Sequence, residues 1–326
     1  MRRMMNRQAI QLVIFCLLST PSSAWNLISN RRGRRFEQIW ILILALLSGL
    51  SACSSPNDII PTSTSTAISP TPTVTFTPSP IPLTPTATPL TCLTQSGIVE
   101  QGVVSSTNPP QEFLIYLPPC YSELTEEKYP VLYLLHGQTF TQDQWVRLGA
   151  PQIADKLIHS SESPPFIIVF PDDRFWNLQA GPGFGDRFIN ALVPYVDANY
   201  RTIPDSEHRS LGGLSRGGGW TVKLGFENLN LFGSLGLHSP AIFKEDSASI
   251  EKIIKNIPEE SRPRLWMDVG DADSELESIL LFEEILTRTG YIHEFHFYAG
   301  SHSEEYWASH VEEYLGWYTS AWIKNQ

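Results

Sequence analysis

The stretch Gly213-Leu214-Ser215-Arg216-Gly217 constrains the fold of this chain more than any other. It reads G-x-S-x-G and lies between a run typical of a β-strand, 208–212, and a run typical of a helix, 220–228. Small residues on both sides of a serine allow a sharp strand-to-helix turn, which exposes the hydroxyl for use as a nucleophile. The pattern therefore predicts a reactive Ser215 at the end of a strand.

Strand-like and helix-like runs alternate from Cys92 onward, a pattern typical of an α/β sheet. The expected strands are 113–117, 131–135, 166–170, 208–212, 233–237, 264–269 and 294–298. The expected helices are 152–159, 188–200, 220–228, 275–288 and 306–324. The last helix carries an aromatic stripe that we expect to pack into the core.

The sequence pattern of residues 1–53 indicates an export region. Arg31 to Arg35 precede an apolar run, 39–50, which is shorter than the ~20 residues that a membrane-spanning helix needs. The run ends in Leu50-Ser51-Ala52-Cys53, which resembles a bacterial lipoprotein signal whose cysteine becomes lipidated. An uncleaved anchor is the alternative. A second apolar segment, 9–18, indicates either a translation start downstream of Met1 or an anchor in two parts.

Residues 54–91 predict a disordered spacer, and residues 92–326 predict one domain with a sizeable core. The spacer has nine prolines, eleven threonines and six serines, and Asp58 is its only charged residue. Such a composition does not bury enough apolar surface to offset the entropy cost of ordering. The spacer would hold the domain away from a cell envelope.

The charge of this chain argues against nucleic acid as a partner, and its cysteine content argues against a metal site. Seven of the 23 Lys and Arg residues but only one of the 34 acids precede Cys53, so the remainder carries 16 bases and 33 acids. A surface this acidic lacks the cationic footprint that nucleic acid requires, and membrane association is expected only through the lipid anchor. Cys92 and Cys120 form an even pair in an exported domain, which predicts a disulfide and, for want of further ligands, no metal site.

Two strand ends downstream of Ser215 carry the side chains that a serine nucleophile needs. The first leads into Asp271-Ala272-Asp273, and the second leads into Gly300-Ser301-His302. A histidine takes the serine proton, and an acid orients the histidine. We expect His302 to be the base and Asp273 the acid, with Asp271 as an open alternative. Asp268, inside the strand, is expected to be a buried hydrogen-bonded acid.

A tetrahedral intermediate also needs amide donors for its oxyanion. One is expected to be the Arg216 amide, and the other the Gln138 amide, which follows Gly137 in the loop after the strand 131–135. We expect His136 to orient this loop. The acidic pairs Asp172-Asp173 and Glu304-Glu305 are expected to be solvated or to cap helices.

Four side chains are candidates for a substrate pocket. Phe175, Trp176 and Phe184 lie in a Pro- and Gly-rich stretch, 171–186, and are suited to stacking on a sugar or phenolic ring. A packed cap loop is the alternative for these three. His238, just before Ser239-Pro240, either lines the site or ends a strand.

Several segments occur together in the predicted domain: Tyr133-Leu134-Leu135-His136-Gly137, Trp145, Pro194-Tyr195-Val196, Tyr200-Arg201-Thr202 and Gly212-Gly213-Leu214-Ser215-Arg216-Gly217-Gly218. In combination they resemble the esterase family that groups esterase D, feruloyl esterases, enterochelin esterases and the mycolyltransferase antigens. The family's Gly-x-x-Asp matches Gly270 to Asp273, and its Gly-x-His matches Gly300 to His302. The resemblance implies an α/β-hydrolase fold, a mostly parallel sheet with helices on both faces, and carboxylic-ester chemistry.

We therefore expect an exported, lipid-anchored serine esterase that needs no cofactor and acts on a small or glycan-linked ester, such as a feruloyl or acetyl group on polysaccharide. Acyl transfer to a sugar hydroxyl and opening of a siderophore lactone stay open as alternatives. The non-enzymatic alternative is a surface binding module, which the presence of all three triad residues disfavours.

Overall fold

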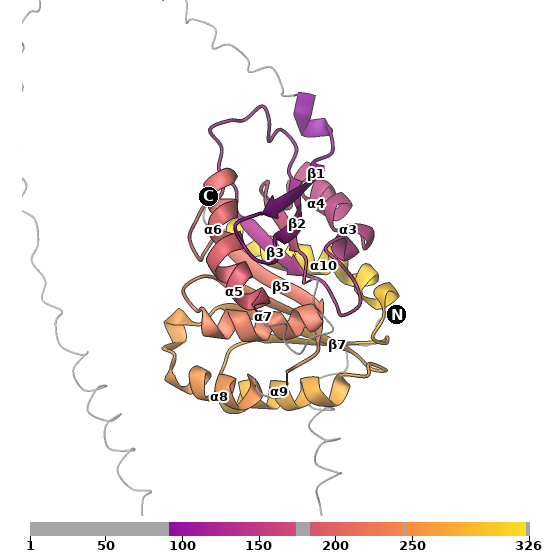
Figure 1. Cartoon of the computed structure of the whole chain (residues 1–326). Helices are drawn as coiled ribbons and strands as arrows, with labels where there is room; N and C mark the ends of the chain where they lie inside the picture. The colour runs from indigo at the N-terminus through magenta and orange to yellow at the C-terminus, as the bar shows by residue number, and fades with distance from the viewer. Residues whose placement is uncertain (1–90, 174–182, 244–245, 324–326) are drawn as a thin grey trace, which may run out of the picture. The chain divides into compact units, whose positions relative to one another are not determined.

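The computed structural model of this chain describes residues 91–173, 183–243 and 246–323 (Figure 1). The predicted export region, its lipidation residue Cys53 and the predicted spacer up to residue 90 lie outside them. Within the described residues, no helix combines the length and the apolar character needed to cross a membrane.

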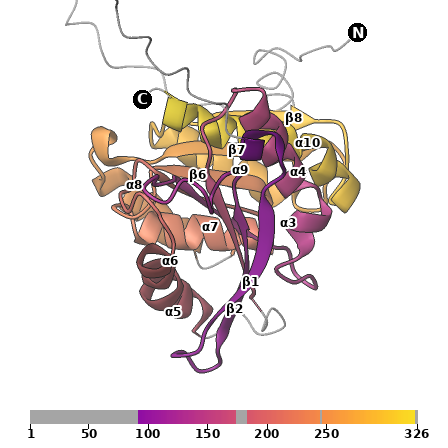
Figure 2. The ribbon, with the colours of Figure 1, turned by 90° about the horizontal axis from the view of Figure 1, so that it is seen from above.

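One sheet of eight strands runs through the described part of the chain (Figure 2). Its order is β1-β2-β4-β3-β5-β6-β7-β8; β2 is antiparallel to both of its neighbours, and the other pairs are parallel. The strands are β1 (Ile98–Val104), β2 (Gln111–Leu117), β3 (Val131–Leu135), β4 (Ile167–Pro171), β5 (Arg209–Ser215), β6 (Ser234–Pro240), β7 (Arg264–Gly270) and β8 (Glu294–Tyr298). The expected mostly parallel α/β sheet is confirmed.

Helices cover both faces of the sheet (Figures 1 and 2). The α-helices are α3 (Gln144–Arg147), α4 (Ala150–His159), α5 (Phe184–Arg187), α6 (Val193–Asn199), α7 (Arg216–Glu227), α8 (Asp246–Asn256), α9 (Leu276–Arg288) and α10 (Glu304–Ile323). Two 3₁₀ turns, Thr91–Thr94 and Glu259–Ser261, and a π-helical turn, Phe188–Leu192, complete the helical elements of the described residues.

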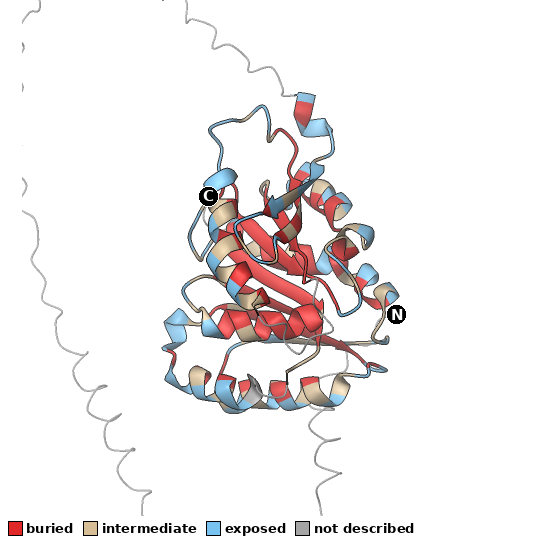
Figure 3. Ribbon diagram, viewed as in Figure 1, coloured by how far each residue is buried: buried red, intermediate tan, exposed pale blue. Residues whose placement is uncertain are grey.

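The central strands are buried on both faces, because alternate side chains enter two separate cores (Figure 3). In β3, Val131, Tyr133 and Leu135 enter the core shared with α6 to α9, whereas Leu132 and Leu134 enter the core shared with α4 and α10. Burial on both faces explains why these strands read as continuous apolar runs in the sequence.

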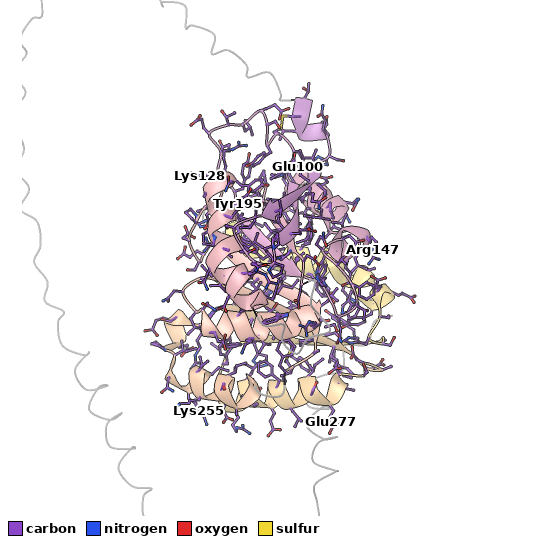
Figure 4. All side chains as sticks on the ribbon, in the orientation of Figure 1. Glu100, Lys128, Arg147, Tyr195, Lys255 and Glu277 are labelled. Carbon is purple, nitrogen blue, oxygen red and sulfur yellow. A yellow bond between two sulfur atoms is a disulfide. The ribbon has the colours of Figure 1, made fainter. Side chains whose placement is uncertain are left out.

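Exposed charged side chains lie on the outer surfaces of the helical layers. Figure 4 shows Lys255 on α8 and Glu277 on α9, and both are exposed. Arg147 on α3 is also exposed and pairs with Asp143 at 3.0 Å. These surface pairs contribute little to stability, so the fold depends on the two apolar cores.

The structure differs from the predicted elements in several places. Helices α3, α5 and α8 were not predicted. The helix expected over 188–200 is a π-helical turn followed by α6, and Pro194, which has no amide hydrogen to donate, lies in the first turn of α6. Helix α7 begins at Arg216, earlier than expected, because glycines 217–219 conceal the helical pattern. Strand β1 was not predicted, since it is an edge strand that is exposed at most positions.

The predicted disulfide is confirmed between Cys92 and Cys120, which are 28 residues apart in the sequence. It ties the turn that precedes β1 to the segment that follows β2. The antiparallel pair of β1 and β2 is thereby closed into a covalent loop at the edge of the sheet.

Replacing both cysteines with alanine should lower the free energy of unfolding by about 3–4 kcal/mol. Without the disulfide, the unfolded chain is no longer closed into a loop and gains conformational entropy. Urea unfolding monitored by circular dichroism measures the loss. A midpoint equal to that of the wild-type protein would contradict a stabilising disulfide.

Candidate active site

Ser215 occupies a strained turn between β5 and α7. Its backbone has φ 53° and ψ −121°, which is unfavourable for a residue with a side chain. The flanking glycines make this turn possible. A Cβ on Gly213 would lie 2.4 Å from the Gly217 carbonyl oxygen, and a Cβ on Gly217 would lie 2.3 Å from the Leu135 carbonyl oxygen. The G-x-S-x-G pattern therefore reflects close packing of α7 against β3 and β5.

His302 lies beside this serine. Its Nε2 is 2.8 Å from Ser215 Oγ, and its Nδ1 is 3.0 Å from Asp273 Oδ1. The histidine comes from the loop between β8 and α10, and Asp273 from the turn after β7. The structure thus brings together the three side chains that the sequence singled out, in the geometry of a serine nucleophile, a base and an orienting acid.

The Asp273 carboxylate is buried and accepts several hydrogen bonds. Its Oδ1 accepts the Glu275 amide at 2.7 Å, and its Oδ2 accepts the Ser239 hydroxyl. Burial raises the pKa of Asp273. The hydrogen bonds from His302, Ser239 and the Glu275 amide together lower the pKa by more than burial raises it, so the pKa lies below its usual value. The carboxylate is therefore charged when it receives His302 Nδ1–H.

Ser239 is a contributor that the sequence analysis missed. It precedes Pro240, the last residue of β6, and has φ 49°. Its Oγ donates to Asp273, and the same oxygen lies 3.0 Å from His302 Nδ1. Its position directly after His238, at the end of a strand that neighbours β5, was the available signal.

The two neighbouring acids have other partners. Asp271 is exposed, and its Oδ1 accepts the Gly300 amide at 2.9 Å, so it shapes the loop that precedes His302. Asp268 is buried and accepts hydrogen bonds from the hydroxyls of Tyr306 and Tyr314 on α10, at 2.7 and 3.0 Å. The geometry favours Asp273 over Asp271 as the acid that orients His302.

The prediction that His238 lines a substrate pocket is wrong. The side chain is fully buried, with Nδ1 3.0 Å from Asp268 and Nε2 3.0 Å from the Tyr318 hydroxyl. Burial lowers the pKa of His238, although the Asp268 carboxylate acts in the opposite direction. His238 therefore belongs to the polar network that anchors α10 on the sheet.

Phe184 is likewise buried, with its ring centroid 5.1 Å from that of Trp220 and 6.0 Å from that of Phe188. It is a core residue and not a pocket wall, so the structure agrees with the packed alternative for this side chain. Phe175 and Trp176 lie outside the described residues. In the described ranges, no group of three or more His, Cys, Asp or Glu side chains could hold a metal ion.

The loop after β3 is held by hydrogen bonds on both sides of Gly137. The Gly137 amide donates to Gln144 Oε1 at 2.8 Å, and the Gly137 carbonyl accepts His136 Nδ1–H at 2.8 Å. Gln144 also donates to Glu304, the first residue of α10, at 3.2 Å. The loop that carries the Gln138 amide is thereby tied to the helix that follows His302.

Asp172 and Asp173 are buried, not solvated as expected from the sequence. They follow β4 at the same edge of the sheet as Ser215. Asp173 Oδ2 accepts Arg216 Nε at 2.9 Å and Trp220 Nε1 at 2.9 Å. The error has a physical cause, since only the tertiary fold supplies the two donors that stabilise this buried charge.

Comparisons with known proteins identify the family of this chain. A family model described as "Putative esterase" matches residues 105–318, which is more than half of the chain. An endo-1,4-β-xylanase/feruloyl esterase of Xylanibacter ruminicola is 32% identical over 163 residues, which are 47% of this chain and 22% of that protein. An esterase of Mycobacterium tuberculosis is 33% identical over 129 residues, 36% of this chain and 27% of that protein. The chain thus spans less than a third of these relatives.

This chain matches a larger share of the length of several solved structures of similar fold. A ferulic acid esterase superposes with a TM-score of 0.62 at 25% identity, over 69% of this chain and 98% of that one. A mutant of the feruloyl esterase module from Clostridium thermocellum, in complex with sinapinate, has a TM-score of 0.61 at 20% identity, over 69% and 89%. The latter likeness shows the shared α/β-hydrolase fold.

Asp273→Asn should slow the reaction of Ser215 with a fluorophosphonate probe by about 10³- to 10⁴-fold, because an amide does not hold His302 in the tautomer that accepts the serine proton. Asp271→Asn is the matched control and should react near the wild-type rate. Intact-mass spectrometry over time measures both rates. The reverse pattern would show that Asp271 is the orienting acid.

Proposed function

This chain belongs to the Putative esterase family, and on that basis we propose that it is a serine hydrolase of carboxylic esters. The observation that carries the proposal is the hydrogen-bonded series from Ser215 Oγ through His302 to Asp273. A serine hydroxyl becomes an effective nucleophile when a neighbouring imidazole takes its proton.

In the proposed mechanism, Ser215 Oγ attacks the ester carbonyl while His302 Nε2 takes its proton. Asp273 accepts Nδ1–H and stabilises the imidazolium. The amides of Gln138 and Arg216 donate to the oxyanion, which also lies at the N-terminus of α7, where the helix dipole favours negative charge. His302 then gives its proton to the departing alcohol, and an acyl group stays on Ser215. Water, deprotonated by His302, releases the acid.

As the substrate we propose an ester of a hydroxycinnamic acid, such as a feruloyl group on a polysaccharide. Two likenesses support this choice: the relative named endo-1,4-β-xylanase/feruloyl esterase and the ferulic acid esterase of known structure, which is 25% identical. A feruloyl ester needs only the ester chemistry above and a site that accepts a planar phenolic ring.

We also propose that the enzyme is exported and held at the cell envelope through lipidated Cys53, with its domain outside the cytoplasm. The basic and apolar segments before Cys53 support this proposal. The disulfide between Cys92 and Cys120 also supports it, because disulfides persist mainly in oxidising compartments.

Ser215→Ala should lower the rate of hydrolysis of methyl ferulate and p-nitrophenyl acetate by about 10⁴-fold or more, because the nucleophile is lost. Ser210→Ala is the matched control, since Ser210 is a buried serine on the same strand. Initial rates of acid or p-nitrophenol release measure the effect, with thermal unfolding as a check on the fold.

Equal turnover by wild-type and Ser215→Ala proteins would contradict the proposed mechanism. Turnover of the acetate that depends on Ser215, without any turnover of the ferulate, would leave the esterase in place and reject the hydroxycinnamoyl substrate.

A further inference from the structure

Four buried side chains near Ser215 form a cluster, and the mechanism above uses none of these side chains. We call His136, Asp173, Arg216 and Trp220 the Asp173 cluster. They come from the ends of β3 and β4 and from the first two turns of α7. The cluster therefore joins three segments that lie far apart in the sequence.

The carboxylate of Asp173 holds the start of α7. Its Oδ2 accepts Arg216 Nε and Trp220 Nε1, each at 2.9 Å, from residues one helical turn apart. Arg216 is the first residue of α7, and its amide is one of the two proposed oxyanion donors. Anchoring the Arg216 and Trp220 side chains restricts movement of the first turn that carries this amide.

The backbone amide of Asp173 holds the other side. It donates to His136 Nε2 at 2.8 Å, so the proton of the neutral ring is on Nδ1, which donates to the Gly137 carbonyl at 2.8 Å. In a trans peptide the C=O and N–H groups point in opposite directions. His136 therefore directs the Gln138 amide, the second proposed donor, away from its own ring.

We propose that Asp173 is a positioning residue that sets the relative placement of the two oxyanion donors, the amides of Gln138 and Arg216. This inference rests on the proposed function. The two amides belong to segments that no short stretch of chain connects, and Asp173 bonds to both segments at once, one through its side chain and one through its backbone. Because oxyanion stabilisation depends on donors fixed in advance, a shift of either amide weakens it.

The decisive variant is Asp173→Ala, tested on p-nitrophenyl acetate and on its thionoester analogue, in which sulfur replaces the carbonyl oxygen. Sulfur is larger than oxygen and a weaker hydrogen-bond acceptor. The ratio of kcat/KM for the oxoester to kcat/KM for the thionoester therefore reports how well the donors fit an oxyanion. Asp173→Ala should lower the oxoester rate by about tenfold to a hundredfold and lower the ratio with it. A general loss of packing would lower both rates and leave the ratio unchanged.

Asp197→Ala is the matched control. Asp197 also accepts from an arginine and a second side chain, Arg209 at 2.7 Å and Thr202 at 2.7 Å, but it lies on α6, outside the cluster. It should leave the ratio at the wild-type value. Asp173→Asn should restore much of the ratio, because its amide oxygen can take the place of Oδ2. Its amide nitrogen would then take the place of Oδ1, which has no hydrogen-bond partner among the described residues.

If Asp173→Ala fails to fold, Trp220→Phe carries the test, since it removes one donor to Asp173 and keeps an aromatic ring. It should lower the ratio by about threefold, the size expected for one weakened hydrogen bond. A wild-type ratio in folded Asp173→Ala, or in Trp220→Phe where Asp173→Ala does not fold, would overturn the inference.

Failure of the proposed function gives a different result. The wild-type protein would then show no ester turnover that depends on Ser215. The rate of Ser215 phosphonylation by a fluorophosphonate, whose oxygen needs the same amide donors, would then decide the role of Asp173. A slower rate in Asp173→Ala than in Asp197→Ala would support it, and equal rates would overturn it.

Discussion

The close contact between Gly217 at the start of α7 and the carbonyl oxygen of Leu135 at the end of β3 is the constraint on which the rest of the site depends. It leaves no room for a side chain, and it places the first turn of α7 directly against the strand ends. Ser215 must then take a positive φ, which directs its hydroxyl out of the strand. The loop that carries Gln138 also lies beside the nucleophile, since a Cβ on Gly137 would be 3.5 Å from Ser215 Cβ. One packing constraint thus fixes both the nucleophile and the geometry of its surroundings.

The parallel sheet supplies the remaining groups at the same edge. Strands β6, β7 and β8 follow β5 in order, and their carboxyl ends carry Ser239, Asp273 and His302. Helix α10 is fixed by the buried network around Asp268, so the loop that holds His302 is anchored at its far end. Gln144 adds a link from this helix to the loop after β3. The site is therefore assembled from rigid elements and short loops.

Much of this arrangement could be predicted from the sequence. The strand pattern, the G-x-S-x-G turn and the order of acid and histidine are local signals, and the structure brings Ser215, Asp273 and His302 into contact. Features that depend on tertiary partners could not be predicted. The buried state of Asp173 depends on donors from α7, and the burial of His238 depends on an acid on β7 and tyrosines on α10. Strand β1 escaped prediction because an exposed edge strand carries little apolar periodicity.

The measurement that tests the central claim most directly is mass analysis of the protein quenched during turnover of a 4-nitrophenyl ester of ferulic acid. The good leaving group makes acylation fast relative to hydrolysis of the intermediate, so the acyl-enzyme should accumulate. The account predicts one feruloyl group on the peptide that contains Ser215. Turnover without any adduct on that peptide, or an adduct on a different residue, would contradict the claim that Ser215 is the nucleophile.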